Sequence, residues 1–353
     1  MHSQESILDL EPFEDALRFA IRADRWDSMV TGKVRSMIGE NPTAMVMGAA
    51  RLHRKALHKL GPGLWWCTER SLAQATAYQV ANLKSHWLGT RHRYDLCCGL
   101  GADAVALCRT GGDSGVRVTA IDQDPLMAAI AGANLRLNGG KSAVDIHVRC
   151  QDVSKLQMDS GSGLHIDPDR RDEQGRKTRV VDYSPPWEAV QRLLERSDSA
   201  VVKIAPVAEP ITEIDRFDRV QRLWVSLAGS VREQSLLFGK AIDRAALHLG
   251  LPLRKSDRVA VAVRTDGSFK VFSGDANSEN VQRVERPMQY IIDPDAAIRA
   301  AGLTTAFALA HELCTLGDAA GFLTGSVNPP DGLCVGEPVV WSGACDDRKL
   351  RKT

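Results

Sequence analysis

One stretch of ten residues constrains the fold of this chain more than any other, because it predicts a strand that runs directly into a glycine loop and then a helix. It reads Tyr94-Asp-Leu-Cys-Cys-Gly-Leu-Gly-Ala-Asp103. Gly99 and Gly101 permit backbone conformations and close approaches that a Cβ would block. In an open α/β sheet, ligands bind beyond the carboxyl ends of the strands. The stretch therefore predicts a loop on which a nucleotide-like ligand lies against bare backbone.

A second segment specifies the ligand further. The apolar strand predicted at 116–122 ends in Asp122, about twenty residues after the glycines, where an acid suits a ribose diol. The glycine spacing differs from the G-x-G-x-x-G of dinucleotide-binding proteins, because Cys97 occupies the first position and no third glycine follows Gly101. This departure favours adenosine without a pyrophosphate. It argues against an NAD-dependent oxidoreductase, as does the lack of a hydride-transfer acid.

Short apolar strands alternate with helices through the middle of the chain. We expect strands at Tyr94–Cys97, Val116–Asp122, Val144–Val148, Leu164–Asp167, Ala200–Ile204 and Leu223–Ser226. This alternation predicts an α/β fold with a mostly parallel, Rossmann-like sheet. The segments 258–264 and 268–272 flank Thr-Asp-Gly and predict a hairpin that supplies an antiparallel edge strand.

The two ends of the chain follow other patterns. Residues 1–90 predict a helical module, with apolar residues at helical spacing in 44–60 and 72–87 and an interruption at Gly61-Pro-Gly63. Thr68 or Ser71 is the candidate cap of the second helix. We place the sheet domain at 91–285 and a C-terminal appendage, with a helix over 296–313, at 286–353.

Composition excludes several classes of protein. Lys plus Arg (45) nearly cancels Asp plus Glu (44), so any nucleic-acid site must be a local patch. Eight cysteines without a C-x-x-C pair or zinc spacing predict reduced, buried thiols and no metal site. The polar amino terminus lacks the pattern of a signal peptide, and no apolar run approaches the roughly 20 residues that span a bilayer. We therefore expect a cytoplasmic protein; the pattern says nothing of its oligomeric state.

Several motifs resemble one family. Asp95-x-Cys97-Cys-Gly99-Leu-Gly101, Ile121-Asp122-Gln-Asp-Pro125 and Asn134 are similar to motif I, the following acid and the next helix of class I S-adenosylmethionine-dependent methyltransferases, trimethylguanosine-synthase-like RNA methyltransferases included. A wider likeness is to bacterial members with a C-terminal THUMP-like domain. It rests on Arg54-Lys-Ala56 with Lys59, Thr68-Glu-Arg-Ser-Leu-Ala-Gln-Ala75, Asp167-Pro-Asp-Arg-Arg171, Tyr183-Ser-Pro-Pro186, Val202-Lys-Ile-Ala-Pro206 and Asp293-Pro-Asp-Ala-Ala-Ile-Arg299. We expect this chain to stop short of that domain.

The resemblance implies S-adenosylmethionine as the cofactor. Its binding residues would be Asp95, Cys97, Gly99, Gly101 and Asp103 in the loop, Asp122 at the ribose and Asp152 at the adenine amino group. Each acid has an alternative role. Asp95 could instead stabilise the turn. Asp122 could cap the helix that begins near Pro125, although Asp124 is the better cap.

The run Asp167-Pro168-Asp169 occupies the place of motif IV, where amino-methylating relatives have Asp/Asn-Pro-Pro-aromatic. Asp167 and the Pro168 carbonyl could accept the protons of an exocyclic amine and direct its lone pair toward the methyl group. Here Asp169 replaces the second proline, and Arg170 and Arg171 replace the aromatic residue. The altered run leaves two interpretations open: an enzyme that methylates an amino nitrogen of RNA, or an inactive protein of the same fold that binds RNA or a protein partner.

Acceptor contacts are predicted from three further segments. Tyr183, Pro186 and Trp187 could form a stacking surface for a base; alternatively, Pro186 begins a helix and Trp187 packs inward. Arg170 and Arg171 suit RNA phosphate through their forked guanidinium groups, or belong to a solvated loop. The basic helix at 51–59 faces either RNA or solvent.

Overall fold

The computed structural model describes residues 7–23, 25–111, 115–140, 143–169, 171–172, 175–176, 179–255, 257–278, 281–316, 321–327 and 331–343. The chain forms two compact units. The first comprises Met1–Ile204, Ala208–Val220 and Leu236–Leu251, and the second comprises Ala205–Val207, Gln221–Ser235 and Pro252–Thr353. The boundary predicted at residue 90 lies inside the first unit, and the one predicted at 285 lies inside the second.

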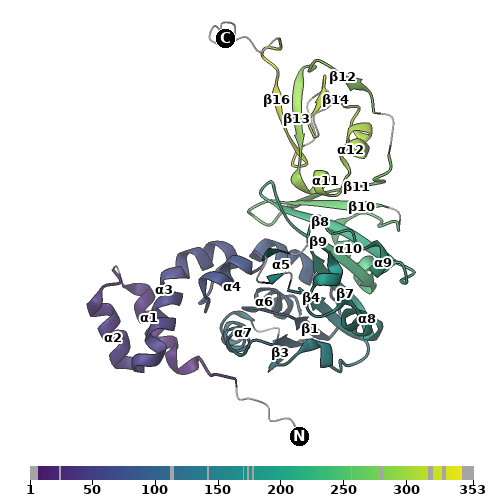
Figure 1. The fold of residues 1–353 in the computed structure, drawn as a ribbon. Coiled ribbons are helices and arrows are strands. Elements are labelled where there is room, and N and C mark those ends of the chain that lie inside the picture. Colours follow the sequence, from purple (N-terminus) through teal and green to yellow (C-terminus); the bar gives the residue numbers. More distant parts are fainter. Residues whose placement is uncertain are drawn as a thin grey trace. The chain divides into compact units, whose positions relative to one another are not determined.

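A parallel sheet forms the centre of the first unit (Figure 1). Its strands are β1 (His92–Leu96), β2 (Val116–Asp122), β3 (Ala143–Cys150), β4 (Ser162–Ile166) and β7 (Ser197–Ile204). They are hydrogen-bonded in the order β7-β4-β1-β2-β3, and all four pairings are parallel. The chain proceeds outward from β1 through β2 to β3 and then returns to the other side of β1 as β4. This reversal puts a topological switch point between β1 and β4, where such sheets bind ligands.

Helices cover this sheet. They are α6 (Ala102–Arg109), α7 (Pro125–Asn138), α8 (Trp187–Arg196) and α10 (Lys240–Leu249). Contacts join α6 and α7 to β2, α8 to β4, and α10 to β7. Shorter elements of the unit are the 3-10 turns Val153–Lys155 and Val180–Asp182, the two-residue strands β5 (Arg171–Asp172) and β6 (Gly175–Arg176), and α9 (Ile211–Ile214).

The amino-terminal part of the first unit is helical, as predicted. It contains the 3-10 turn Glu11–Phe13, α1 (Glu14–Arg22), α2 (Ser28–Ile38), α3 (Glu40–Leu60), α4 (Glu69–Gln74) and α5 (Tyr78–Ser85). Helix α3 ends at Gly61, whose φ of +84° accounts for the glycine. Thr68 caps α4 in a capping box with Ser71. The helix predicted at 72–87 is two helices instead, because the backbone at Ala75 is extended (ψ 145°).

The second unit contains the predicted hairpin, and it shares with the first unit a strand that was not predicted from the sequence. β8 (Val220–Leu227) and β10 (Arg258–Val263) are parallel, and β11 (Phe269–Gly274) runs antiparallel to β10 as an edge strand. β9 (Ser230–Gly239) returns the chain to the first unit and was not predicted. The mostly parallel, Rossmann-like fold class with an antiparallel edge is therefore confirmed.

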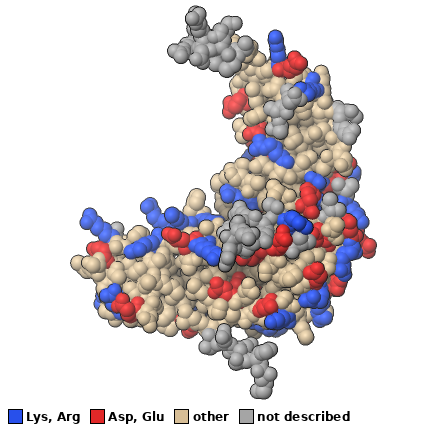
Figure 2. Space-filling model, viewed as in Figure 1, with Lys and Arg blue, Asp and Glu red and all other residues tan. Residues whose placement is uncertain are grey.

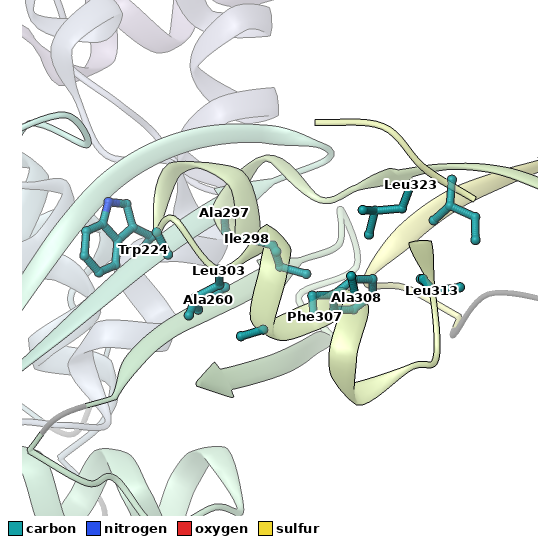
Figure 3. Packing of buried hydrophobic residues seen from close by; sticks show 12 residues of the cluster. Trp224, Ala260, Ala297, Ile298, Leu303, Phe307, Ala308, Leu313 and Leu323 are labelled. Carbon is teal, nitrogen blue, oxygen red and sulfur yellow. The ribbon is translucent and has the colours of Figure 1, made fainter. Parts of the chain in front are cut away.

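The C-terminal part is itself an α/β structure. Strands β12 (Arg283–Val284), β13 (Tyr290–Pro294), β14 (Cys314–Leu316), β15 (Leu323–Gly325) and β16 (Cys334–Pro338) form a sheet in the order β12-β14-β15-β13-β16. The helix predicted at 296–313 is divided into α11 (Ala296–Ala300) and α12 (Thr304–Ala310) by Gly302, with φ +69°. Both helices pack into one apolar cluster with Trp224, Ala260 and Leu323 (Figure 3). Within the described residues, no helix is both long and apolar enough to cross a membrane.

Candidate functional site

The loops after four parallel strands meet at one edge of the first unit's sheet. Backbone hydrogen bonds join them: Cys98 N to Ile121 O (3.1 Å), Gln151 N to Asp122 O (3.0 Å) and Asp167 N to Leu96 O (3.2 Å). The first two tie the loops after β1 and β3 to the end of β2, and the third ties the loop after β4 to β1. The predicted crevice residues from these loops are therefore neighbours in space.

The glycine loop has an unusual backbone. Gly99 (φ +53°) and Gly101 (φ +86°) adopt the left-handed conformation, and so does Cys97 (φ +57°), which is rare for a residue with a Cβ. A Cβ added at Gly99 would meet no atom within 4 Å, whereas one at Gly101 would lie 3.2 Å from Ala131 Cα of α7. Gly99 thus leaves one side of the loop open, and Gly101 permits close packing of loop and helix.

Cys97 occupies this loop as a neutral thiol. Burial, followed by the negative charges of Asp122 and Asp167, raises its pKa well above the ordinary value. A thiol of this kind is a poor nucleophile, because the thiolate is the reactive form. Cys97 therefore contributes shape and backbone conformation to the loop.

Asp122 and Asp124 divide the two roles predicted for the acid after β2. Asp124 caps α7, accepting from Leu126 N (2.8 Å) and Met127 N (3.3 Å), with Pro125 in the first turn. Asp122 accepts from Gly99 N (2.8 Å) and Asp124 N (3.0 Å), one bond on each oxygen. A carboxylate has about four lone-pair positions, so acceptor capacity remains on this partly exposed group. It is suited to the two hydroxyl groups of a ribose.

Asp152 follows β3 at the same edge. It caps the turn Val153–Lys155 by accepting from Ser154 N (2.9 Å), and hydrogen bonding by Ser154 lowers the pKa of its carboxyl. The side chain is 42% exposed, with one oxygen 3.8 Å from Lys155 Nζ. Its contact with an adenine amino group stays a prediction.

Asp95 of β1 and Asp103 of α6 belong to an ionic network with His165 and Lys84. Asp95 is 1% exposed, and its Oδ1 is 2.7 Å from His165 Nδ1. Lys84 Nζ of α5 is 3.1 Å from His165 Nε2 and 3.1 Å from Asp103 Oδ1. An ammonium can only donate, so His165 accepts at Nε2 and donates from Nδ1 to Asp95. This pair joins β1 to β4 just before the glycine loop, and a contact of Asp95 or Asp103 with the cofactor stays a prediction.

The two acids respond to burial differently. Burial raises the pKa of Asp95 above its ordinary value. Burial alone would also raise the pKa of Asp103, but the charge of Lys84, followed by the effects of His165, Lys203 and Thr76, outweighs it and holds that pKa well below the ordinary range. Asp103 is therefore a carboxylate, paired with Lys84 at 3.1 Å.

The same network reaches Asp167. Lys203 of β7 places Nζ 2.6 Å from Asp167 Oδ2 and 3.2 Å from Thr76 Oγ1. Sequence reasoning assigned no role to Thr76, Lys84 or Lys203. The one available signal was a lysine inside the apolar strand Val201-Val-Lys-Ile204, because a charge in such a strand is almost always paired.

The predicted acceptor segments lie side by side. Asp169 N donates to Ser184 O (2.8 Å) and Ser184 N to Asp169 O (3.0 Å). Tyr183 and Trp187 are only 5% and 6% exposed, and Trp187 begins α8 and donates to Glu213 O (3.1 Å). The stacking surface predicted from these two rings is therefore wrong, because both rings pack inward.

The other acceptor residues are less buried or are not described. Pro186 is exposed, and Pro168 is buried with its carbonyl following β4. Arg170 lies outside the described residues. For Arg171 the structure describes the backbone, in β5, and not the side chain.

Asn134 connects the helical part to the glycine loop. It accepts from Trp66 N (2.8 Å) and donates to Trp66 O (2.9 Å) and Leu100 O (2.8 Å), and it is 0% exposed. One turn later, Asn138 forms the same pair of bonds with Leu64 N (3.2 Å) and Leu64 O (2.9 Å). The resemblance gave Asn134 no role beyond membership of a motif. In the structure it is a clamp, a side chain that holds the backbone of Trp66 and of Leu100 to α7.

The residues at this edge fit S-adenosylmethionine. The open side of Gly99 and the spare acceptor positions of Asp122 suit an adenosine group lying on the loop. Within the described ranges, no three His, Cys, Asp or Glu side chains gather as metal ligands.

Known proteins are similar to this chain in sequence and in fold. No family model matches it. It is 29% identical over 323 residues to two proteins named uncharacterized S-adenosylmethionine-dependent methyltransferases, from Mycobacterium tuberculosis strains CDC 1551 and H37Rv, with 85% of this chain and 78% of each relative covered. The crystal structure of a putative methyltransferase from Porphyromonas gingivalis W83 matches with a TM-score of 0.70 at 17% identity, over 94% of this chain and 83% of that one. At that identity the structural match shows the fold alone.

Proposed function

We propose that this chain is an S-adenosylmethionine-dependent methyltransferase that modifies an amino nitrogen of an RNA base. The observation that carries the proposal is the position of Asp167. It follows β4 next to the glycine loop of β1, and its carboxylate is 28% exposed while one oxygen is held by Lys203. The predicted cofactor is also the one named for both mycobacterial relatives.

The residues divide the chemistry between binding and proton acceptance. S-adenosylmethionine, when bound, supplies an electrophilic methyl group on a sulfonium. The glycine loop and Asp122 hold the adenosine end, with Asp152 available to the base. Asp167 and the Pro168 carbonyl accept the protons of the acceptor amine and orient its lone pair. No covalent intermediate with the protein is required.

A local basic surface supports RNA as the acceptor. Arg51, Arg54, Lys55 and His58 are all exposed on α3 at spacings of three and four residues, which puts them on one face of the helix. Figure 2 shows Lys and Arg gathering over the part of the first unit that contains α3 and α4. Because the net charge is only +1, such a patch is what attraction to a polyanion would require.

Transfer of a labelled methyl group to fractionated cellular RNA, protein and metabolites tests this function directly. We expect label in RNA, on a base nitrogen after nucleoside analysis. Label in protein alone would refute the RNA acceptor and retain the enzyme. Cofactor binding by calorimetry without transfer to any fraction would favour the alternative function, a binding protein that has kept the cofactor fold.

A further inference from the structure

We propose that Lys203 is a positioning residue for methyl transfer, which fixes the Asp167 carboxylate and is itself fixed by Thr76. This inference rests on the proposed function, in which Asp167 contacts the acceptor amine. It adds a second element to the acceptor site: the segment between α4 and α5, in the helical part of the first unit.

Lys203 determines which oxygen of Asp167 is free. β4 and β7 are parallel neighbours, with Ile166 paired to Val202, so the next residue of each, Asp167 after β4 and Lys203 within β7, lie beside each other. The Lys203 side chain is 7% exposed, and its Nζ is 2.6 Å from Asp167 Oδ2. A buried ammonium requires a paired anion. With Oδ2 held in this pair, Oδ1 is the oxygen left for an acceptor amine.

Thr76 in turn fixes Lys203. Its hydroxyl accepts from Lys203 Nζ at 3.2 Å, and the interaction of Thr76 with Asp103 contributes to the low pKa of that acid. An ammonium can only donate, so the Thr76 hydroxyl is the acceptor in its bond with Lys203. Asp103 lies in the first turn of α6, directly after the glycine loop. Three side chains thus connect the cofactor loop to the acceptor carboxylate.

The surrounding charge explains why this lysine is needed. The negative charges of Asp122, Asp167 and Asp169 all act on Cys97 at the same edge. Within the described residues, Lys203 is the cation that forms an ion pair with Asp167. Without it, repulsion from the neighbouring acids would favour rotation of Asp167 toward solvent and away from the acceptor.

Two substitutions in the full-length chain test the inference. Lys203→Met removes the charge and keeps the length of the side chain; Lys203→Arg keeps the charge. In Lys203→Met we expect unchanged cofactor affinity by calorimetry and a single-turnover transfer rate that falls roughly tenfold to a hundredfold, the scale of a small misplacement at a reacting centre. Lys203→Arg should recover part of the rate. Thr76→Val should lower the rate less than Lys203→Met.

Lys240→Met is the matched control. Lys240 pairs with Asp198 at the amino end of β7, at 2.9 Å, but is 66% exposed and lies outside the site. This variant should transfer at the normal rate. The inference is overturned if Lys203→Met also transfers normally, if it loses cofactor binding together with transfer, or if Lys203→Arg is no better than Lys203→Met.

Failure of the proposed function would look different. If the unmodified protein transfers label to no fraction, the proposed function fails, and crystal structures of the two Lys203 variants decide the positioning role. An Asp167 carboxylate that turns away in Lys203→Met and stays in Lys203→Arg supports that role. A carboxylate in the same place in both variants overturns it.

Discussion

Replacement of Asn134 by alanine should separate the clamp described above from ordinary core packing. The substitution leaves three buried backbone groups without their partner: Trp66 N, Trp66 O and Leu100 O. At a net contribution of about 1 kcal/mol for each hydrogen bond, the free energy of unfolding should fall by about 3 kcal/mol. For a unit of this size, that corresponds to a fall in Tm of about 6–12 °C.

Asn138→Ala provides the matched comparison. Asn138 is one helical turn away and makes two bonds to Leu64 and one to Asn134 O, three in all, but none to the glycine loop. Both variants should therefore lose comparable stability. Only Asn134→Ala should also weaken cofactor binding, because it releases the Leu100 carbonyl within the loop.

Thermal unfolding followed by far-ultraviolet circular dichroism measures the first effect, and calorimetric titration with S-adenosylmethionine below the transition measures the second. The reasoning would be refuted if Asn134→Ala unfolded within about 1 kcal/mol of the unmodified protein. It would also be refuted if Asn138→Ala weakened cofactor binding to the same degree, since the effect would then be general loosening of α7.

Further substitutions address the site acids and the predicted phosphate contacts. Asp122→Ala should weaken S-adenosylmethionine binding by a few kcal/mol at most, and the unmodified protein should not bind NAD; calorimetry checks both. Asp167→Ala should leave cofactor affinity almost intact and slow methyl transfer by at least about a hundredfold, so a normal rate would rule out the amine mechanism. The double change of Arg170 and Arg171 to alanine should flatten the salt dependence of RNA binding by up to about two phosphate contacts; an unchanged slope contradicts this. The pKa of Asp103 is lower in the folded protein than in the unfolded chain, so its carboxylate stabilises the fold at any pH above the unfolded pKa. This stabilisation is lost as the pH falls from the unfolded pKa toward the folded pKa. Asp103→Asn should therefore remove part of the acid destabilisation measured by urea unfolding from neutral pH down to about pH 3.

Local signals were sufficient wherever the structure depends on neighbouring residues. The capping box at Thr68, the helix end at Gly61 and the cap at Asp124 all follow from residue types at fixed short spacing. The β2 bounds were predicted without error, because an apolar run ends there in an acid. These elements required no knowledge of tertiary contacts.

The predictions that failed depend on burial, which no short pattern reports. β9 was missed because Glu233, Gln234 and Ser235 are polar yet at most 1% exposed, with Ser235 Oγ donating to Glu233 at 2.9 Å. From sequence alone, Trp187 could equally well stack on a base or pack inward at the start of a helix. Its burial in the first unit favours inward packing. The ion pair of Asp95 was missed for the same reason, because its partner His165 is 70 residues away in sequence.

The glycine loop shows how these two kinds of information combine. Cys97 holds a left-handed backbone that costs on the order of 1–3 kcal/mol for a residue with a Cβ, and such strain persists only where its surroundings determine it. The next two residues hold the loop to the end of β2, because Cys98 N donates to Ile121 O and Gly99 N donates to Asp122 Oδ2. Before the loop, Asp95 holds β1 to β4 through its contact with His165. Two glycines are therefore enough in this loop, because hydrogen bonds and buried charges hold the conformation that a third glycine would otherwise permit.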